Sequence, residues 1–223
     1  MMRLLLIHTG GAEGSIALAD MGVEPVIVAA ELLPGRTSSE RLVPVVRQMM
    51  EARGWRLKDL AAVVVVHGPG SFTGVRVGLS AAKGLSEAGD VPLIGVSRLA
   101  LLAETAGVGA GTVHGVLDAG RGEFYHGEYV GRRCVGETLL TRDTLLADVG
   151  DGTIVACEAK VMEALGTVRA LMVAEPAAAD ALPLALERLV RGEVDDAAVL
   201  DANYLRRTDY ELLAKMAVGR KSE

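Results

Sequence analysis

The feature that most constrains the fold of this chain is a glycine-rich segment, residues 67–85, which follows an unbroken apolar run. The run Ala61–Val66 ends in four consecutive valines, and uninterrupted β-branched residues are typical of a strand buried on both faces. Gly68, Pro69 and Gly70 then allow backbone angles that other residues avoid and end the strand. The sequence therefore predicts a buried strand followed by a tight elbow.

A helix is expected to follow the elbow. Ser71 and Thr73 are both good N-cap residues, so the helix should begin at about Gly74. A strand, a glycine loop and a helix N-terminus together form a geometry that can bind anions. Val75-Arg76 stands where a P-loop needs Lys-Ser/Thr, and Thr73 stands where a dinucleotide-binding fingerprint needs its third glycine. The remaining interpretation of the motif itself is a tight turn that packs a helix closely on its sheet.

The predicted elbow helix has a stripe of very small side chains. Gly74, Gly78 and Ala82 recur every four residues and therefore share one face. Such a face lets another backbone come closer than the separation of about 8–10 Å that is usual for packed helices. The approaching backbone could belong to the chain's own sheet or to a partner, and the pattern alone leaves both open.

A second candidate contact surface lies on an earlier helix. The segment Thr37–Glu40 has the pattern of a capping box, which predicts a helix start. The residues that follow include an apolar stripe at helical spacing, Leu42, Val45, Val46, Met49 and Met50. Methionine suits a surface that adapts to partners. Pro44 lies past the first turn, where it should bend the helix.

The remaining pattern indicates two lobes. In the first half, strands are predicted at Leu4–Thr9, Ser15–Ala19, Pro25–Glu31, the valine run and Leu93–Val96, with a further helix capped by Ser97. A second unit starts at Thr112, with strands at Val113–Leu117 and Phe124–Val130 around a glycine turn. Because both halves open with the same hairpin, we interpret the chain as a weak internal duplication. The lobes would span residues 1–108 and 109–223, joined by small residues at 108–111.

Composition limits the classes of function. Hydrophobic residues make up 50% of the chain but aromatic residues only 3%, so the core must consist of Ala, Val and Leu. No apolar run approaches the ~18 residues of a membrane span, and the amino-terminal apolar stretch is too short for a signal peptide. Cys134 and Cys157 are expected to be reduced thiols in a cytoplasmic protein. The formal net charge of -6 argues against strong autonomous binding to a polyanion.

No catalytic set is evident in the sequence. No two of the four histidines are four residues apart, as a helical metal site would require. The segment Gly70–Gly74 lacks the spacing of a Gly-x-Ser-x-Gly nucleophile elbow. Asp118 and Glu123 could be paired carboxylates, but capping of a hairpin turn is the simpler interpretation. We therefore expect no catalytic, metal or cofactor site.

The string Gly68-Pro69-Gly70-Ser71-Phe72-Thr73-Gly74-Val75-Arg76 resembles the signature of the TsaB (YeaZ) family, the non-catalytic partner subunit in bacterial tRNA threonylcarbamoyladenosine synthesis. Further matches follow in family order: Leu6–Thr9, Arg41–Pro44, Ile94–Ser97, Asp118-Ala119, Gly122–Tyr125 and Tyr204–Arg206. The resemblance covers nearly the whole chain and is strongest up to about residue 130.

The resemblance implies an α/β fold with two lobes of the actin-like ATPase class (ribonuclease H-like), the second lobe being reduced. In that superfamily an Asp at the end of the first strand helps to hold the magnesium of a bound nucleotide. Here the position is His8, which cannot reproduce the hard oxygen ligation that magnesium prefers. Ser38 also departs from the family, which often has His in the first-helix cap. His8 and the short second lobe, which leaves little chain for an adenosine pocket, imply that nucleotide hydrolysis is lost, and Ser38 is a further departure in the same direction.

The implied function is that of a cytoplasmic, non-enzymatic subunit that activates a TsaD-type transferase, together with a TsaE-type ATPase. Contact with tRNA would be indirect, and no membrane is involved. The first helix and the elbow helix would pair with their counterparts on TsaD or on a second copy of the chain, through Leu42, Val46, Met49, Gly74, Gly78 and Ala82. The elbow motif would be structural: Gly68, Pro69, Gly70, Ser71, Phe72, Thr73, Gly74 and Arg76. The alternative is an autonomous nucleotide-binding ATPase, or another small-molecule enzyme, that uses the elbow loop.

Overall fold

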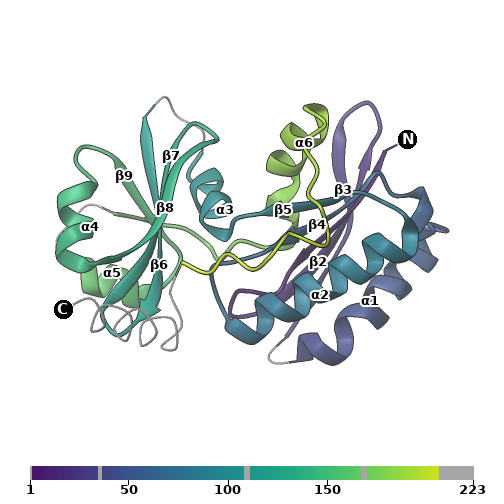
Figure 1. The fold of residues 1–223 in the computed structure, drawn as a ribbon, viewed down its shortest axis with the longest axis horizontal. Helices are drawn as coiled ribbons and strands as arrows, with labels where there is room; N and C mark the ends of the chain where they lie inside the picture. The colour runs from purple at the N-terminus through teal and green to yellow at the C-terminus, as the bar shows by residue number, and fades with distance from the viewer. Residues whose placement is uncertain (1, 35–36, 108–110, 167–169, 206–223) are drawn as a thin grey trace, which may run out of the picture.

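The protein forms two α/β lobes side by side (Figure 1). The computed structural model describes residues 2–34, 37–107, 111–166 and 170–205. The expected linker therefore lies largely outside the described residues, as does Arg206 of the last family match.

The first lobe is built on a five-stranded mixed sheet with strand order β3-β2-β1-β4-β5. Its strands are β1 (Arg3–His8), β2 (Gly14–Met21), β3 (Pro25–Leu33), β4 (Ala62–Val66) and β5 (Leu93–Val96). The first three form an antiparallel meander, and β4 and β5 continue parallel to β1. Helices α1 (Ser38–Ala52) and α2 (Phe72–Gly89) connect β3 to β4 and β4 to β5, with the short 3-10 helix η2 (Leu57–Asp59) before β4.

The second lobe repeats this connectivity, with strand order β8-β7-β6-β9-β10. Its strands are β6 (Thr112–Gly120), β7 (Glu123–Val130), β8 (Arg133–Thr141), β9 (Thr153–Ala156) and β10 (Ala170–Met172). The helices α4 (Arg142–Asp148) and α5 (Ala159–Leu165) take the places of α1 and α2 but have only 7 residues each, against 15 and 18. The predicted α/β fold is confirmed: two actin-like, ribonuclease H-like lobes, of which the second is reduced.

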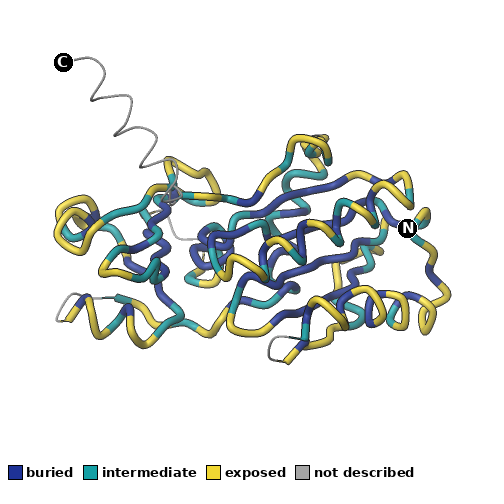
Figure 2. The backbone as a smooth tube through the Cα atoms, turned by 60° about the horizontal axis from the view of Figure 1, so that its bottom comes forward, coloured by how far each residue is buried: buried dark blue, intermediate teal, exposed yellow. Residues whose placement is uncertain are grey.

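The core of the first lobe lies on both faces of the sheet. Every residue of β4 is buried, and β1 is buried from Leu4 onward, as the dark blue strands in Figure 2 show. Leu5, Ile7 and Val63 pack under α1 and α2, while Leu4 and Val64 point to the opposite face. An unbroken apolar run suits such a strand because successive side chains alternate between two covered faces.

Three further helical elements cover the two sheets, and each packs on the sheet of the other half of the sequence. Residues of α3 (Arg98–Thr105) pack on the sheet of the second lobe, where Leu99 and Leu102 cluster with Leu117 and Tyr129. Conversely, the 3-10 helix η3 (Ala178–Ala181) and α6 (Leu182–Val190) return to the first sheet. The expected division at 108 and 109 therefore needs a modification, because the chain after about residue 177 packs with the first lobe.

The start of α1 differs in detail from the predicted capping box. Thr37 is the N-cap residue, but its side chain makes no capping bond, and its hydroxyl donates to the Pro34 carbonyl oxygen at 2.8 Å instead. The helix begins at Ser38, as the sequence pattern indicated, and continues through Pro44 to Ala52.

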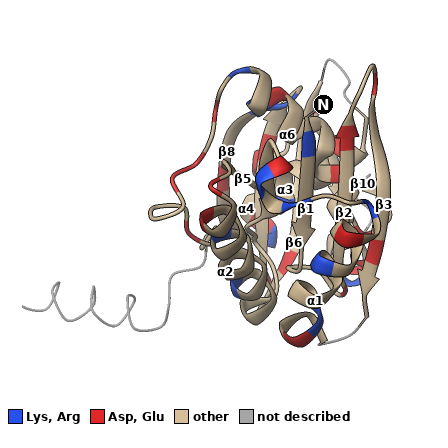
Figure 3. Ribbon diagram, turned by 90° about the vertical axis from the view of Figure 1, so that its right-hand side faces the viewer, with Lys and Arg blue, Asp and Glu red and all other residues tan. Residues whose placement is uncertain are grey.

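Acidic and basic residues both occur on the elements visible in Figure 3. Within the described ranges, no helix is both long enough and apolar enough to cross a membrane.

Candidate functional site

The elbow joins β4 to α2 through a backbone that only certain residues can adopt. Gly68 has a φ of 108°, in the region that favours glycine, and the Gly68–Pro69 peptide bond is cis. Helix α2 begins at Phe72, two residues before the predicted start, and the Ser71 hydroxyl caps it by accepting a hydrogen bond from the Gly74 N–H at 3.3 Å. The predicted strand, elbow and Ser71 cap are thus observed.

The elbow lies directly on the turn between β1 and β2. The Ser71 N–H donates to the Gly10 carbonyl oxygen at 2.9 Å, and the Thr9 hydroxyl donates to the Gly74 carbonyl oxygen at 2.6 Å. A Cβ on Gly70 would overlap the Gly10 carbonyl, and one on Gly74 would overlap the Thr9 carbonyl. Close backbone approach, rather than a positive φ, therefore requires glycine at both positions.

The small-residue stripe of α2 faces the chain's own sheet. A Cβ on Gly78 would overlap the Thr9 hydroxyl and lie 3.6 Å from Ile7 Cγ2, and Ala82 is fully buried. Of the two arrangements that the sequence left open, packing on β1 is the one observed. This corrects the expectation that Gly78 and Ala82 form a surface for a partner.

Several residues of the predicted partner surface on α1 are also internal. Leu42 and Val46 are 2% and 1% exposed and belong to the core beneath the helix, whereas Met49 is half-buried. The exposed face of the two helices includes other residues, among them Arg41, Val43, Arg47 and Gln48 on α1, and Phe72, Arg76 and Ser80 on α2. A partner approaching these helices from outside would meet that second set.

A cavity of about 630 Å³ lies where the two lobes meet. It is lined by the β1–β2 turn, the elbow, the β6–β7 turn and residues after β9. The basic groups in it are engaged by acidic neighbours: Arg98 donates to Glu175 at 2.5 Å, and Lys160 forms an ion pair with Asp118 at 2.6 Å. An anionic ligand would have to compete with these carboxylates. Asp118, which the sequence offers as a pair with Glu123, thus forms its ion pair with a lysine of α5.

His8 occupies the end of β1, where the resemblance places an acidic residue in nucleotide-hydrolysing relatives. The side chain is completely buried, and its Nδ1 accepts a hydrogen bond from the Gly10 N–H at 3.2 Å. Burial, assisted by the nearby charge of Arg98, lowers the pKa of His8 to about 3. The imidazole is therefore neutral at physiological pH and offers no carboxylate oxygen to a metal ion.

Acid should destabilise the protein through His8. The unfolded chain binds a proton at this residue below its ordinary pKa of 6.5, whereas the folded chain does so only at about pH 3, so stability is lost as the pH falls below 6.5. Between about pH 7.5 and about pH 5 this residue alone should remove about 2 kcal/mol. Urea unfolding at both pH values should show a smaller loss for His8→Asn, whose side-chain oxygen can still accept from the Gly10 N–H. Equal losses in parent and variant would contradict this assignment.

The other histidines do not form a metal centre. His114 and His126 stack in the second lobe with Nδ1 and Nε2 2.8 Å apart, and burial lowers the pKa of each. His67 lies at the elbow, with Nδ1 3.1 Å from the Asp201 carbonyl oxygen. In the described part of the chain, no three His, Cys, Asp or Glu side chains are grouped to hold a metal ion.

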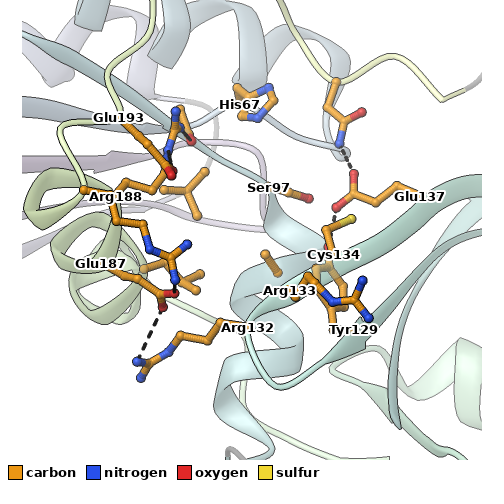
Figure 4. Close-up of a pocket in the computed structure, with 16 residues that line it drawn as sticks. His67, Ser97, Tyr129, Arg132, Arg133, Cys134, Glu137, Glu187, Arg188 and Glu193 are labelled. Atoms are coloured by element: carbon orange, nitrogen blue, oxygen red, sulfur yellow. Dashed lines mark hydrogen bonds and ion pairs between the residues drawn. The ribbon is translucent and has the colours of Figure 1, made fainter.

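A second cavity, of about 530 Å³, also lies between the lobes and contains residues that the sequence did not indicate (Figure 4). Arg132 from the β7–β8 turn forms a bidentate contact with Glu104 of α3 and lies 3.7 Å from Glu187 of α6. Glu137 on β8 accepts from the Tyr129 hydroxyl and from the Asn203 amide. No motif links these residues, whose contacts depend on the placement of the two lobes.

The two lobes have the same strand order, and the cavity beside the glycine elbow lies where they meet. This repeated topology is that of a two-lobed protein of the actin-like class. The family model for TsaD, tRNA N6-adenosine threonylcarbamoyltransferase, matches residues 22–153. The tRNA threonylcarbamoyladenosine biosynthesis protein TsaB of Escherichia coli (strain K12) is 40% identical over 130 residues, which cover 57% of this chain and 55% of that protein. TsaB of Bacillus subtilis (strain 168) is 32% identical over 148 residues, which cover 66% and 64%.

Among solved structures, YeaZ from Pseudomonas aeruginosa superposes with a TM-score of 0.77 and 30% identity, covering 92% of this chain and 100% of that one. The chain belongs to the TsaB (YeaZ) family, as its elbow motif indicated. It spans less than two thirds of the length of the two curated relatives.

Proposed function

We propose that the protein is a non-catalytic subunit in the formation of N6-threonylcarbamoyladenosine on tRNA, and that it docks on and activates a TsaD-type transferase. The observation that carries this proposal is the similarity of the chain to TsaB proteins, which are named for that biosynthesis. The partner is suggested by the match to the TsaD family model. A chain that shares the fold of the transferase can pair its helices α1 and α2 with the equivalent two helices of the transferase.

The interlobe cleft supports a role without chemistry of its own. His8 is a neutral, buried base at the position from which an acidic side chain would reach a bound metal, and the cleft's Arg98 and Lys160 are paired with carboxylates. The second lobe, with helices of 7 residues, offers little surface for a nucleoside. A TsaE-type ATPase, a homodimer through the same helices and a cytoplasmic location complete the proposal, with tRNA contacted through the partner.

Reconstitution tests this role. The purified transferase and ATPase from the same genome should form threonylcarbamoyladenosine on tRNA at a much higher rate when this chain is added, whereas the chain alone should form none. An unchanged rate on addition of the chain, with all components folded, would contradict the proposal.

The alternative is an autonomous nucleotide-binding ATPase, which the 630 Å³ cleft beside the elbow would favour. A ligand that binds the folded state raises its melting temperature by mass action, and a concentration about 100 times the Kd contributes about 2.7 kcal/mol. We expect millimolar ATP with magnesium to leave the melting temperature of the isolated chain unchanged. A clear rise, absent with magnesium alone, would favour the ATPase.

A further inference from the structure

Two aromatic side chains are exposed together on the surface. Phe72, at the start of α2, is 57% exposed, and Tyr204, in the segment after α6, is 47% exposed. The other aromatic residues in the described ranges, Trp55, Phe124, Tyr125 and Tyr129, are buried or half-buried. In a chain with only 3% aromatic residues, leaving two of them in water at one place is unexpected for packing alone.

Arg76 joins the two rings into one cluster. Its guanidinium carbon lies 3.5 Å from the centre of the Phe72 ring, and its Nε donates to the Tyr204 hydroxyl at 2.7 Å. The two rings are 6.2 Å apart between centroids. Stacking on an aromatic face orients the planar guanidinium without neutralising its charge.

The cluster is held in place from both lobes. The segment after α6, yellow in Figure 1, runs from the first lobe toward the second. Just before Tyr204, the Asn203 N–H donates to the His67 carbonyl oxygen at 2.8 Å, and the Asn203 side-chain amide donates to Glu137 of β8 at 2.5 Å. A contact surface fixed in this way loses little side-chain entropy when a partner binds.

The charge of Arg76 indicates the chemistry of that partner. The Arg76 Nε donates to the Tyr204 hydroxyl, and no carboxylate among the described residues forms an ion pair with Arg76. A guanidinium whose remaining donors have no carboxylate partner among the described residues, flanked by aromatic surface, matches a carboxylate set beside apolar atoms. Arg and aromatic residues dominate binding energy at protein interfaces. We propose that Phe72, Arg76 and Tyr204 form an anchor that binds an acidic side chain of the protein partner. This inference rests on the proposed function, because the partner it tests is the transferase.

A protein partner fits better than RNA. Arginine and aromatic rings also bind single-stranded nucleic acid, but such sites lie in positively charged grooves. Here the chain has a net charge of -6, and acidic residues lie among the basic ones in Figure 3.

Calorimetric titration with the purified transferase from the same genome tests the anchor. Arg76→Ala and Phe72→Ala should each raise the Kd about tenfold or more, and Arg76→Lys should also weaken binding because lysine lacks the bidentate fork. Arg133→Ala, which removes an exposed arginine from the edge strand β8, should leave the Kd within about twofold. Raising the salt concentration should weaken the parent complex more than the Arg76→Ala complex.

The outcomes separate the two proposals. No binding by the parent would overturn the proposed function and the anchor together. Binding by the parent with unchanged Kd in the Arg76 and Phe72 variants would overturn the anchor alone. If the Arg76 and Phe72 variants melt at a lower temperature but bind the transferase as the parent does, the cluster serves to pack the segment after α6. Loss of tRNA binding in Arg76→Ala with transferase binding intact would assign it to nucleic acid, and each result would contradict the anchor.

Discussion

The Gly78→Leu variant should lose about 3 kcal/mol or more of its free energy of unfolding and melt about 10 °C lower than the parent. Gly78 lies in α2 against β1, and a Cβ there would already overlap the Thr9 hydroxyl beside Ile7. A leucine would push α2 away from the sheet and break the hydrogen bond of Thr9 to the Gly74 carbonyl. Thermal melting followed by circular dichroism measures the effect.

Gly84→Leu is the matched control, because it places the same side chain on the same helix where a Cβ meets nothing within 4 Å. Leucine has a higher helix propensity than glycine by up to about 1 kcal/mol, so this variant should melt at or slightly above the parent temperature. Parent-like melting of Gly78→Leu would show that the stripe does not pack on β1, and that the orientation of α2 described above is incorrect.

Gly70→Val should destabilise the protein to a similar extent by separating the elbow from the β1–β2 turn. The added Cβ would overlap the Gly10 carbonyl and lie 3.2 Å from Arg98 Nη1, which threatens both the Ser71–Gly10 hydrogen bond and the ion pair of buried Arg98 with Glu175. The overlap with a backbone carbonyl cannot be relieved by turning a side chain, and overpacking of this kind costs about 3 kcal/mol or more, so we expect a large fall in the melting temperature or failure to fold.

Gly136→Val serves as the control for this change, because a Cβ there meets nothing within 4 Å and the residue lies in the exposed edge strand β8. Because valine favours strands, the melting temperature of the Gly136→Val variant should stay close to that of the parent. If Gly70→Val melts as Gly136→Val does, the elbow has no need of glycine at residue 70.

The first lobe could be predicted well from the sequence because its strands are buried and its helices are long. The valine run of β4, the Ser71 cap and the Leu93–Val96 strand carry strong local signals, and the structure confirms each. The second lobe carried weaker signals. Strand β8 and helix α4 were not predicted, because β8 is an edge strand with mostly exposed residues and α4 has only 7 residues, too few to show a period.

The site was predictable only where it is local in sequence. The elbow glycines could be identified from their spacing, but the direction in which the Gly78 stripe faces depends on β1, about 70 residues earlier. The pair of Arg98 with Glu175 spans 77 residues, and the Asn203–Glu137 bond spans 66. Sequence spacing carries no information on such contacts, because they form only when the two lobes and the terminal segment come together.

Association with the transferase tests the central claim most directly. The tagged chain and the TsaD-type transferase from the same genome, expressed together, should purify as a complex and sediment as a single species heavier than either protein alone. Separate sedimentation of the two folded proteins at micromolar concentration would contradict the account.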